Sequence, residues 1–403
     1  MTGNAIVGQS GGPTSVINAS LCGIAHAVRS FRGIGTLYGM RWGIEGLLGR
    51  AITDLSAEDP RVIDGLRSTP SSALGSCRYK LSDADLPRIL EILRDLDIRF
   101  FFLIGGNDTM DTINRLERYC RSRGYGLAGI GVPKTVDNDL FGTDHTPGYG
   151  SAARYVALSV QQAGRLARDM QRVDKFVVHQ TVGRNVGWLA AAAALGKRSA
   201  QDAPHLIYVP ERPVTREGVV ADVRRCVQEY GWASIVCGEG IVWEDGIPVS
   251  ASRTQDRFAN VEFGAMGGTS AAIALHRLIT EETGFRGEFQ ITESLAMCAA
   301  DRASEVDREE AYQCGRHAVT LAEQGQTGVM VAIRRESGSP YGVSYGTIPL
   351  AEVAARAKPM PAAYIAPTGN AVTAAYLDYA RPLAGSLAPY AELRNMTVGS
   401  KEQ

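Results

Sequence analysis

The chain has 403 residues, which is long for one ordinary core and suits two α/β lobes. Its 45% hydrophobic and 21% charged residues are typical of a soluble globular protein. The formal net charge of −1 creates no overall field toward nucleic acid or an anionic membrane, so we expect neither as a partner. Any bound phosphate must therefore be held by locally placed cations and backbone N–H groups.

The cysteines are scattered and odd in number, and they form no Cys-x-x-Cys pair: Cys22, Cys77, Cys120, Cys226, Cys237, Cys298 and Cys314. This pattern is typical of a reducing compartment, with neither a disulfide framework nor a structural zinc site. Residues 4–7 already have the pattern of a strand, so we expect no signal peptide. The longest apolar stretch, residues 188–195, is too short to span a bilayer, and we expect a cytoplasmic location.

Short apolar runs alternate with amphipathic stretches through most of the chain. The runs predict strands at residues 5–7, 35–38, 99–104, 127–132, 176–180, 206–209 and 234–237. The amphipathic stretches predict helices, the clearest at residues 14–30, 108–123, 152–168 and 216–230. This alternation implies right-handed βαβ units, and therefore an α/β fold of parallel sheets covered by helices.

Glycine-rich and polar segments follow three of these strands, at residues 9–12, 105–108 and 134–137. Ligands of parallel sheets bind beyond the carboxyl ends of the strands, so we expect these segments to form a single site.

The first segment lies within Gly-Gln-Ser-Gly-Gly-Pro-Thr, residues 8–14. Glycines after a strand let backbone N–H groups approach a phosphate, and the following helix would add its positive end. The dinucleotide fingerprint and the P-loop are both excluded, because G-x-G-x-x-G is absent and no Gly-Lys-Ser/Thr follows. Taken alone, the segment is equally compatible with a simple tight turn.

Two more segments place charged side chains at turns. Gly-Ser-Cys-Arg-Tyr-Lys at residues 75–80 sets Arg78 and Lys80 two positions apart, as an anion site or as an ordinary solvated loop. In Gly-Gly-Asn-Asp-Thr at residues 105–109, Asp108 either caps the following helix or holds Mg²⁺ beside a phosphate.

Pro-Lys-Thr-Val-Asp-Asn-Asp at residues 133–139 gives the most specific signal. Phosphoryl transfer needs a base near the attacking hydroxyl and positive charge near the transferred group. Asp137 and Asp139, two positions apart, and Lys134 supply both within one loop. A purely structural loop rarely gathers such residues after a buried strand.

Together, these four segments resemble the phosphofructokinase family in order and spacing. Residues 182–184, Val-Gly-Arg, are similar to its Met-Gly-Arg element, and residues 209–211 and 238–240 fall where the family has Pro-Glu and Glu-Gly. The resemblance covers nearly the whole chain. It implies two Rossmann-like parallel-sheet lobes with the active site in the cleft between them.

Two positions in this resemblance indicate the phosphoryl donor. ATP-using members resemble this chain except for glycine at the positions of Asp108 and Lys134. An Asp side chain would crowd and repel a nucleotide α-phosphate, whereas a lysine ammonium offsets the charge of diphosphate. The resemblance therefore implies the diphosphate-dependent type, with fructose 6-phosphate as acceptor and Mg²⁺ as cofactor.

The roles of the family's functional residues carry over position by position. Asp137 resembles the general base, Asp139 would support it or help to hold the metal, and Lys134 would steady the charge of the transition state. The diphosphate would be bound by Gly11, Gly12, Arg78, Lys80, Asp108 and Thr109, with the metal at Asp108. The sugar phosphate would be bound by Thr135, Val182, Gly183, Arg184, Glu239 and Lys175.

Lys175 stands where relatives reach the acceptor phosphate across a subunit interface, which implies a homodimer or homotetramer; an ordinary surface lysine is the alternative. The resemblance also assigns residues 1–149 and about 299–328 to a diphosphate- and metal-binding lobe, and residues 150–298 to a sugar-phosphate lobe. Residues 329–403 are expected to pack on the lobes as a C-terminal extension.

Two departures from the family pattern stand out. Asn107 replaces a metal-binding Asp of many relatives, and Met297 replaces the arginine that grips the 6-phosphate of fructose 6-phosphate. Losing that arginine removes a charge-assisted bond worth ~1.5–3 kcal/mol, unless Arg286 or Arg302 substitutes for it.

Two alternatives follow: the same chemistry on another sugar phosphate or polyol, or a non-catalytic regulatory member of the family. The intact Asp137, Asp139 and Lys134 argue against the second alternative.

Overall fold

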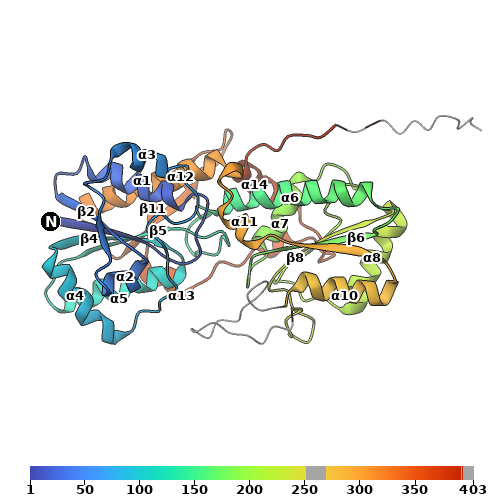
Figure 1. Ribbon diagram of the computed structural model, residues 1–403, viewed down its shortest axis with the longest axis horizontal. Helices are drawn as coiled ribbons and strands as arrows, with labels where there is room; N and C mark the ends of the chain where they lie inside the picture. The colour runs from blue at the N-terminus through green and yellow to red at the C-terminus, as the bar shows by residue number, and fades with distance from the viewer. Residues whose placement is uncertain (251–268, 392, 394–403) are drawn as a thin grey trace, which may run out of the picture.

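The computed structural model describes residues 1–250, 269–391 and 393, which form two α/β lobes side by side along the long axis of the molecule (Figure 1). The first lobe is built on a seven-stranded sheet in the order β11-β10-β5-β4-β1-β2-β3, and the second on a four-stranded sheet in the order β7-β8-β6-β9. The strands are β1 Gly3–Gln9, β2 Ile34–Met40, β3 Ile52–Asp54, β4 Ile98–Gly105, β5 Ala128–Pro133, β6 Phe176–Thr181, β7 Leu206–Tyr208, β8 Ala233–Gly238, β9 Gly287–Ile291, β10 Val329–Arg335 and β11 Val343–Pro349.

The α-helices of the described residues cover both sheets. They are α1 Ile17–Val28, α2 Gly43–Leu48, α3 Pro60–Leu66, α4 Leu86–Asp95, α5 Asn107–Ser122, α6 Tyr149–Asp169, α7 Trp188–Ala192, α8 Arg216–Tyr230, α10 Ala271–Thr283, α11 Glu293–Cys298, α12 Glu305–Glu323, α13 Leu350–Ala355 and α14 Ala374–Ala384. Within these residues, no helix is both long and apolar enough to cross a bilayer.

The first sheet is parallel at its centre and antiparallel at both edges, where β3 pairs with β2 and β11 with β10. Helices α1, α3 and α12 lie on one face, and α2, α4, α5 and α13 lie on the other (Figure 1). Strand β4 shows why its sequence is a continuous apolar run. Phe100 and Phe102 enter the core beneath α1, whereas Phe101 and Leu103 enter the opposite core. A strand with both faces covered has no polar side.

The second sheet is entirely parallel. Helices α6, α7 and α14 pack on one face, and α8 and α10 pack on the other. Local signals set the helix ends: the Thr215 side chain accepts a hydrogen bond from the Gly218 N–H at the start of α8, and Gly231 ends the helix with a φ of 85°.

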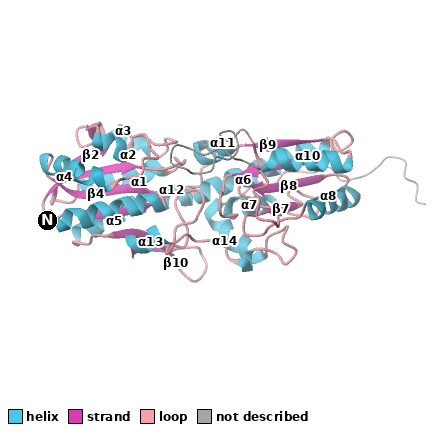
Figure 2. Ribbon diagram, turned by 90° about the horizontal axis from the view of Figure 1, so that it is seen from below, coloured by secondary structure: helices cyan, strands magenta, loops and turns pink. Residues whose placement is uncertain are grey.

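Helices α11, α12 and α14 lie at the junction of the lobes (Figure 2). Asp307 of α12 accepts hydrogen bonds of 2.9 Å from the backbone N–H groups of Gly148 and Ser151, at the start of α6. Because α12 packs on α1 of the first lobe and α6 belongs to the second, this buried carboxylate joins the two lobes.

The α/β class and the parallel sheets agree with the sequence-based expectation, and every predicted strand is present. The segment after residue 328 is arranged differently from the C-terminal extension that was expected. Residues 329–349 do not pack on the lobes from outside, because β10 pairs in parallel with β5 and β11 completes the sheet edge. The apolar run Val-Met-Val-Ala-Ile in β10 covers a strand that would otherwise expose its edge. Only the chain beyond β11 packs against the finished lobes, through α13 and α14.

Candidate active site

A cavity of about 770 Å³ lies where the carboxyl ends of strands from both sheets meet. The first lobe contributes the segments after β1, β4 and β5 and the turn around Arg78; the second contributes the segments after β6 and β8 together with α11. The cavity walls contain all the residues selected from the sequence except Gly183 and Lys175: Gly11, Gly12, Arg78, Lys80, Asp108, Thr109, Lys134, Thr135, Asp137, Asp139, Val182, Arg184 and Glu239.

The glycine segment after β1 is tied to the turn that carries Arg78. Ser76 donates a hydrogen bond to the carbonyl of Gly11, and the Gly11 N–H donates to the carbonyl of Cys77. Gly11 has a φ of 77°, which favours glycine, and a Cβ there would lie 3.2 Å from Lys134 Nζ. The two segments therefore form one continuous wall of the cavity.

The expected positive helix end lies elsewhere. Helix α1 begins only at Ile17, beyond the cavity wall, so its N-terminus does not face the site. Helix α5 does face it, because Gly106, Asn107 and Asp108 at its start all line the cavity. The partial positive charge of a helix N-terminus is thus supplied by α5.

Asp108 does not cap α5. The N-cap residue is Gly106, without a side-chain cap, and Asp108 lies in the first helical turn with its side chain available to the cavity. Beside it, the buried Oδ1 of Asn107 has no hydrogen-bond partner, while its Nδ2 lies 3.4 Å from Asp139 Oδ2. An unpartnered amide oxygen next to a carboxylate fits a hard divalent cation, which prefers oxygen ligands. Asp108 and Asn107 are the residues that could hold such a cation.

Lys134 is buried, with 3% of its surface exposed, and its Nζ donates a hydrogen bond of 2.7 Å to the carbonyl of Gly12. Burial lowers the pKa of this ammonium to about 8, although Asp137 and Asp139 oppose the shift. The lysine therefore places a desolvated positive charge between the glycine segment and the carboxylates.

Asp137 faces Lys134 from the end of the same loop. Burial, together with the charge of the neighbouring Asp139, raises the pKa of Asp137 to about 7, against the attraction of Lys134 and Arg184. Burial also raises the pKa of Asp139. A carboxylate with a pKa near 7 is well matched to accept a proton from a hydroxyl at neutral pH.

Asn138 fixes the backbone between these two carboxylates. It has a φ of 57°, and its side-chain oxygen accepts from the Thr146 N–H while its Nδ2 donates to the Tyr379 hydroxyl. Lys358 donates from Nζ to Asn138 Oδ1 at 3.3 Å and from its backbone N–H to the Asp139 carbonyl at 2.7 Å. The C-terminal part of the chain thus holds the loop in place.

The second lobe presents Arg184, Glu239 and Val182 to the cavity. Glu239 accepts a hydrogen bond of 3.2 Å from the Gly183 N–H, so Gly183 shapes the wall from behind. Burial raises the pKa of Glu239 to about 7, with Glu293 as the next contribution. Near neutral pH, this side chain can both donate to and accept from a hydroxyl of a bound sugar.

Met297 of α11 lines the cavity, as do Ser294 and Glu293. A Cβ at Gly12 would lie 3.7 Å from Met297 Sδ, so this side chain faces the glycine segment. Neither arginine considered as a substitute lines the cavity: Arg286 pairs with Asp174, and Arg302 lies over the ring of Tyr155.

Lys175 lies at the amino end of β6, opposite the cavity, and its Nζ donates to the carbonyl of Gln171 at 2.8 Å. It does not take part in the cavity of its own chain. Several residues that line the cavity were not predicted from the sequence: Tyr79, Asp111, Thr112, Arg115, Asn185, Val186 and Glu293. Helical spacing could have found some of them, because Asp108, Thr112 and Arg115 lie at i, i+4 and i+7 on one face of α5.

A base with a pKa near 7, a desolvated lysine, a glycine-lined wall and the cations Arg78 and Lys80 line the cavity from the first lobe, and Arg184 and Glu239 line it from the second. This arrangement defines a phosphotransferase, whose task is to position the reacting groups and neutralise their charge.

Residues 4–322 match the family model described as Phosphofructokinase, and the chain belongs to that family. The chain is 39% identical over 387 residues to the pyrophosphate–fructose 6-phosphate 1-phosphotransferase of Halomonas elongata, covering 94% of this chain and 91% of that protein. It is 35% identical over 353 residues to the sulfofructose kinase of Alkalicoccus urumqiensis, covering 85% and 87%. The pyrophosphate-dependent phosphofructokinase structure from Nitrosospira multiformis superposes with a TM-score of 0.87 at 35% identity, covering 96% and 94%.

Proposed function

We propose that the enzyme transfers a phosphoryl group from diphosphate to the 1-hydroxyl of fructose 6-phosphate, giving fructose 1,6-bisphosphate and phosphate. The observation that carries the choice of donor is the pair Asp108 and Lys134, which face the same cavity where ATP-using relatives have glycine. A nucleotide would meet the Asp108 carboxylate, whereas diphosphate gains a buried ammonium from Lys134. Relatives and structures named for this reaction support the proposal.

The donor is bound by the first lobe. Gly11 and Gly12 let the backbone approach the phosphates, while Arg78 and Lys80 add positive charge from the neighbouring turn. Asp108, together with the amide oxygen of Asn107, would hold Mg²⁺. When bound, Mg²⁺ neutralises charge on the diphosphate oxygens.

The reaction follows from the loop after β5. Asp137 accepts the proton of the 1-hydroxyl as the oxygen forms a bond to the terminal phosphorus, and the bond from that phosphorus to the bridging oxygen breaks to release phosphate. Lys134 offsets the charge that develops on the transferred group, and Thr135 positions the acceptor. Asp139 favours uptake of the proton, because its charge raises the pKa of Asp137.

The acceptor is bound by the second lobe, through Arg184, Glu239 and the backbone around Gly183. Lys175 faces away from its own cavity, so we assign it to the acceptor phosphate of a neighbouring subunit in a homodimer or homotetramer. We also place the enzyme in the cytoplasm, because all its cysteines are free.

One panel of assays tests the proposal: diphosphate and ATP as donors, each with fructose 6-phosphate, free fructose and sulfofructose as acceptors. The expected result is turnover with diphosphate, Mg²⁺ and fructose 6-phosphate, and little with ATP. Efficient ATP use with diphosphate inert would reject the assignment of the donor. Faster turnover of another acceptor would reject fructose 6-phosphate as the preferred acceptor. The uncharged Met297 in the cavity wall is the reason for testing the other acceptors.

A further inference from the structure

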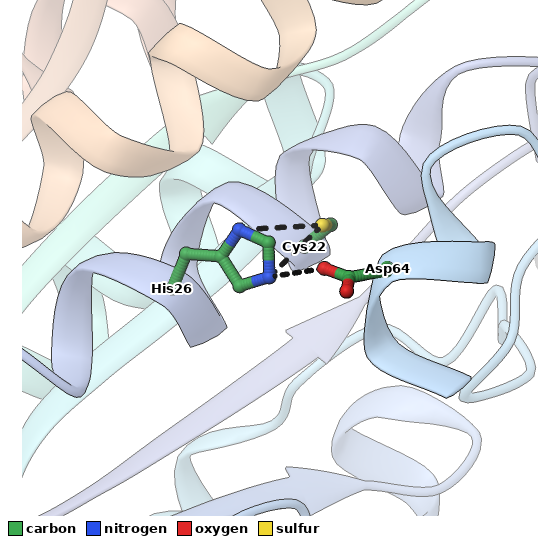
Figure 3. A group of neighbouring side chains, drawn as sticks. All are labelled: Cys22, His26 and Asp64. Carbon is green, nitrogen blue, oxygen red and sulfur yellow. Dashed lines mark hydrogen bonds and ion pairs between the residues drawn. The ribbon is translucent and has the colours of Figure 1, made fainter. Parts of the chain in front are cut away.

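A second group of metal-ligating side chains lies outside the active-site cavity, between α1, α3 and α12. Cys22 and His26 are four residues apart on α1 and share one face of the helix, and Asp64 approaches them from α3 (Figure 3). One ligand atom from each lies within 4.8 Å of the others. None of these side chains lines the active-site cavity.

The distances are close to those of a tetrahedral metal centre. His26 Nε2 lies 2.9 Å from Asp64 Oδ1, and Cys22 Sγ lies 3.8 Å from the same nitrogen and 3.9 Å from Nδ1. In a zinc site, bonds of ~2.0–2.3 Å separate the ligand atoms by roughly 3.3–3.6 Å. Cys22 is buried, and because its Sγ is almost equally far from both ring nitrogens, the thiol would turn toward the Nε2 lone pair to share a cation with Asp64. Asp64 is largely exposed and free to adjust, since 64% of its side chain is accessible.

The outer contacts of His26 favour the same arrangement. Its Nδ1 lies 3.1 Å from the hydroxyl of Tyr312 on α12, and Arg316 donates to that hydroxyl oxygen at 3.3 Å. When Nδ1–H donates to Tyr312, the lone pair of Nε2 faces the Asp64 carboxylate, and a cation between them removes the repulsion. Metal-ligating histidines nearly always have such a partner on the other ring nitrogen.

The same residue types also occur in hydrolases with a cysteine nucleophile, but the environment here excludes that role. Burial and, to a lesser extent, the Asp64 carboxylate raise the pKa of the Cys22 thiol to about 11. A nucleophilic cysteine needs the opposite shift and access to a substrate.

We propose that Cys22, His26 and Asp64 bind a zinc-type divalent cation, with water in the fourth position. The thiolate and the carboxylate together neutralise the charge of the ion, and the borderline-soft ligand set suits zinc better than magnesium. The ion would clamp α3 onto α1, the helix that follows the glycine segment of the active site. The cysteine pattern gave no sign of zinc, because this ligand set contains only one cysteine.

The test uses the full-length protein, freed of metal and kept in excess Mg²⁺ so that the active site does not compete. Zn²⁺ is titrated against a chromophoric chelator, and Co²⁺ is added separately to look for a thiolate-to-cobalt charge-transfer band. We expect one equivalent of tight binding, a rise in Tm with Zn²⁺ and a cobalt band. Cys22→Ala, His26→Gln and Asp64→Asn should abolish tight binding, and Tyr312→Phe should weaken it by about 10–100-fold.

Matched controls are Cys298→Ala and Asp301→Asn, which remove a partly exposed thiol and an exposed carboxylate elsewhere. Both should bind Zn²⁺ like the wild type. Asp64→Asn removes only an exposed side chain, and retained phosphotransferase activity will show that this variant is folded. Tight zinc binding that survives both His26→Gln and Asp64→Asn, or a wild-type affinity no greater than that of His26→Gln, would overturn the proposal.

Discussion

At the scale of single residues, Asp137 combines burial with a reactive position. Its carboxylate lines the cavity beside Asp139 and Lys134, and the raised pKa keeps it able to take a proton near neutral pH. Asp137→Asn preserves the size of the side chain and removes the proton acceptor. We expect kcat to fall about 10²–10⁴-fold with little change in the KM of either substrate. Steady-state kinetics will check this, with the surface variant Asp301→Asn as control, and an unchanged kcat would contradict the assigned role.

The same carboxylate predicts opposite effects of pH on activity and stability. Because the pKa of Asp137 rises from 3.8 to about 7 on folding, its stabilising proton is fully held below about pH 4 and lost as the pH rises through 7. Activity should rise as the pH passes through about 7, because the ionised carboxylate is the form that accepts the proton. The folded wild type should therefore lose roughly 2 kcal/mol of unfolding free energy between pH 5.5 and pH 8. Asp137→Asn has no such proton to lose, so its stability relative to the wild type should rise by the same amount. Denaturant unfolding at both pH values measures this, and an equal difference at both would refute it.

Met297 lines the cavity at the position where the family resemblance leads us to expect an arginine. It faces the cavity without charge, and neither Arg286 nor Arg302 replaces the missing cation. Met297→Arg should lower the KM for fructose 6-phosphate by about 10–150-fold, the value of one charge-assisted bond of ~1.5–3 kcal/mol. Met297→Leu is the uncharged control. Because this side chain also faces Gly12, the KM for diphosphate is measured as well, and a change confined to diphosphate would show that the residue serves the donor.

At the scale of elements, the loop after β5 depends on a segment far away in the sequence. Lys358 donates to Asn138 Oδ1 and to the carbonyls of Thr143 and Asp144, so that it supports both ends of the loop. Lys358→Met should reduce kcat by about 10–100-fold through misplacement of Asp137, with smaller changes in KM. The matched control is Lys197→Met, which removes another partly buried lysine that donates to a carbonyl. If both variants lose kcat equally, the effect is one of general stability.

These elements also show which parts of the fold and the site could be predicted from the sequence. The loops after β1, β4 and β5 were predicted to meet because carboxyl ends of parallel strands share one edge, a rule that needs no knowledge of packing. The link between Lys358 and Asn138 spans 220 positions and leaves no local pattern, so it could not be predicted. Strand β3 has three residues and a half-exposed face, which is too short a run to detect.

The start of α1 was misplaced for a different reason. The sequence pattern extends the helix back to Thr14, yet the ordered turn begins at Ile17 and its N-cap, Val16, has no side-chain cap. The non-helical segment after β1 is therefore longer than the sequence pattern indicates, and α5 rather than α1 supplies the helix end at the cavity.

At the scale of the whole molecule, the cavity combines a first lobe rich in cations and glycines with a second lobe that presents Arg184, Glu239 and Met297. Within the described residues, Arg184 is the one cation that the second lobe adds to the cavity, on the side where we propose that the acceptor binds. Lys175 and Arg286 are adjacent at the amino ends of β6 and β9, joined by a backbone hydrogen bond of 2.7 Å, and both are remote from this cavity. In the homo-oligomer that we propose, this end of one subunit would reach the cavity of another.

Subunit complementation tests that arrangement directly. Asp137→Asn lacks the base, and Lys175→Ala should keep kcat but raise the KM for fructose 6-phosphate, so each variant alone is a poor enzyme at low acceptor concentration. In a mixed dimer, one cavity has its own Asp137 and receives Lys175 from the partner, and it is intact. Random exchange makes about half of the dimers mixed, so activity should recover to about a quarter of the wild-type rate. The measurement is the rate after co-refolding, with unmixed variants as controls. No recovery, despite mixed dimers detected by mass, would confine Lys175 to a structural role in its own chain.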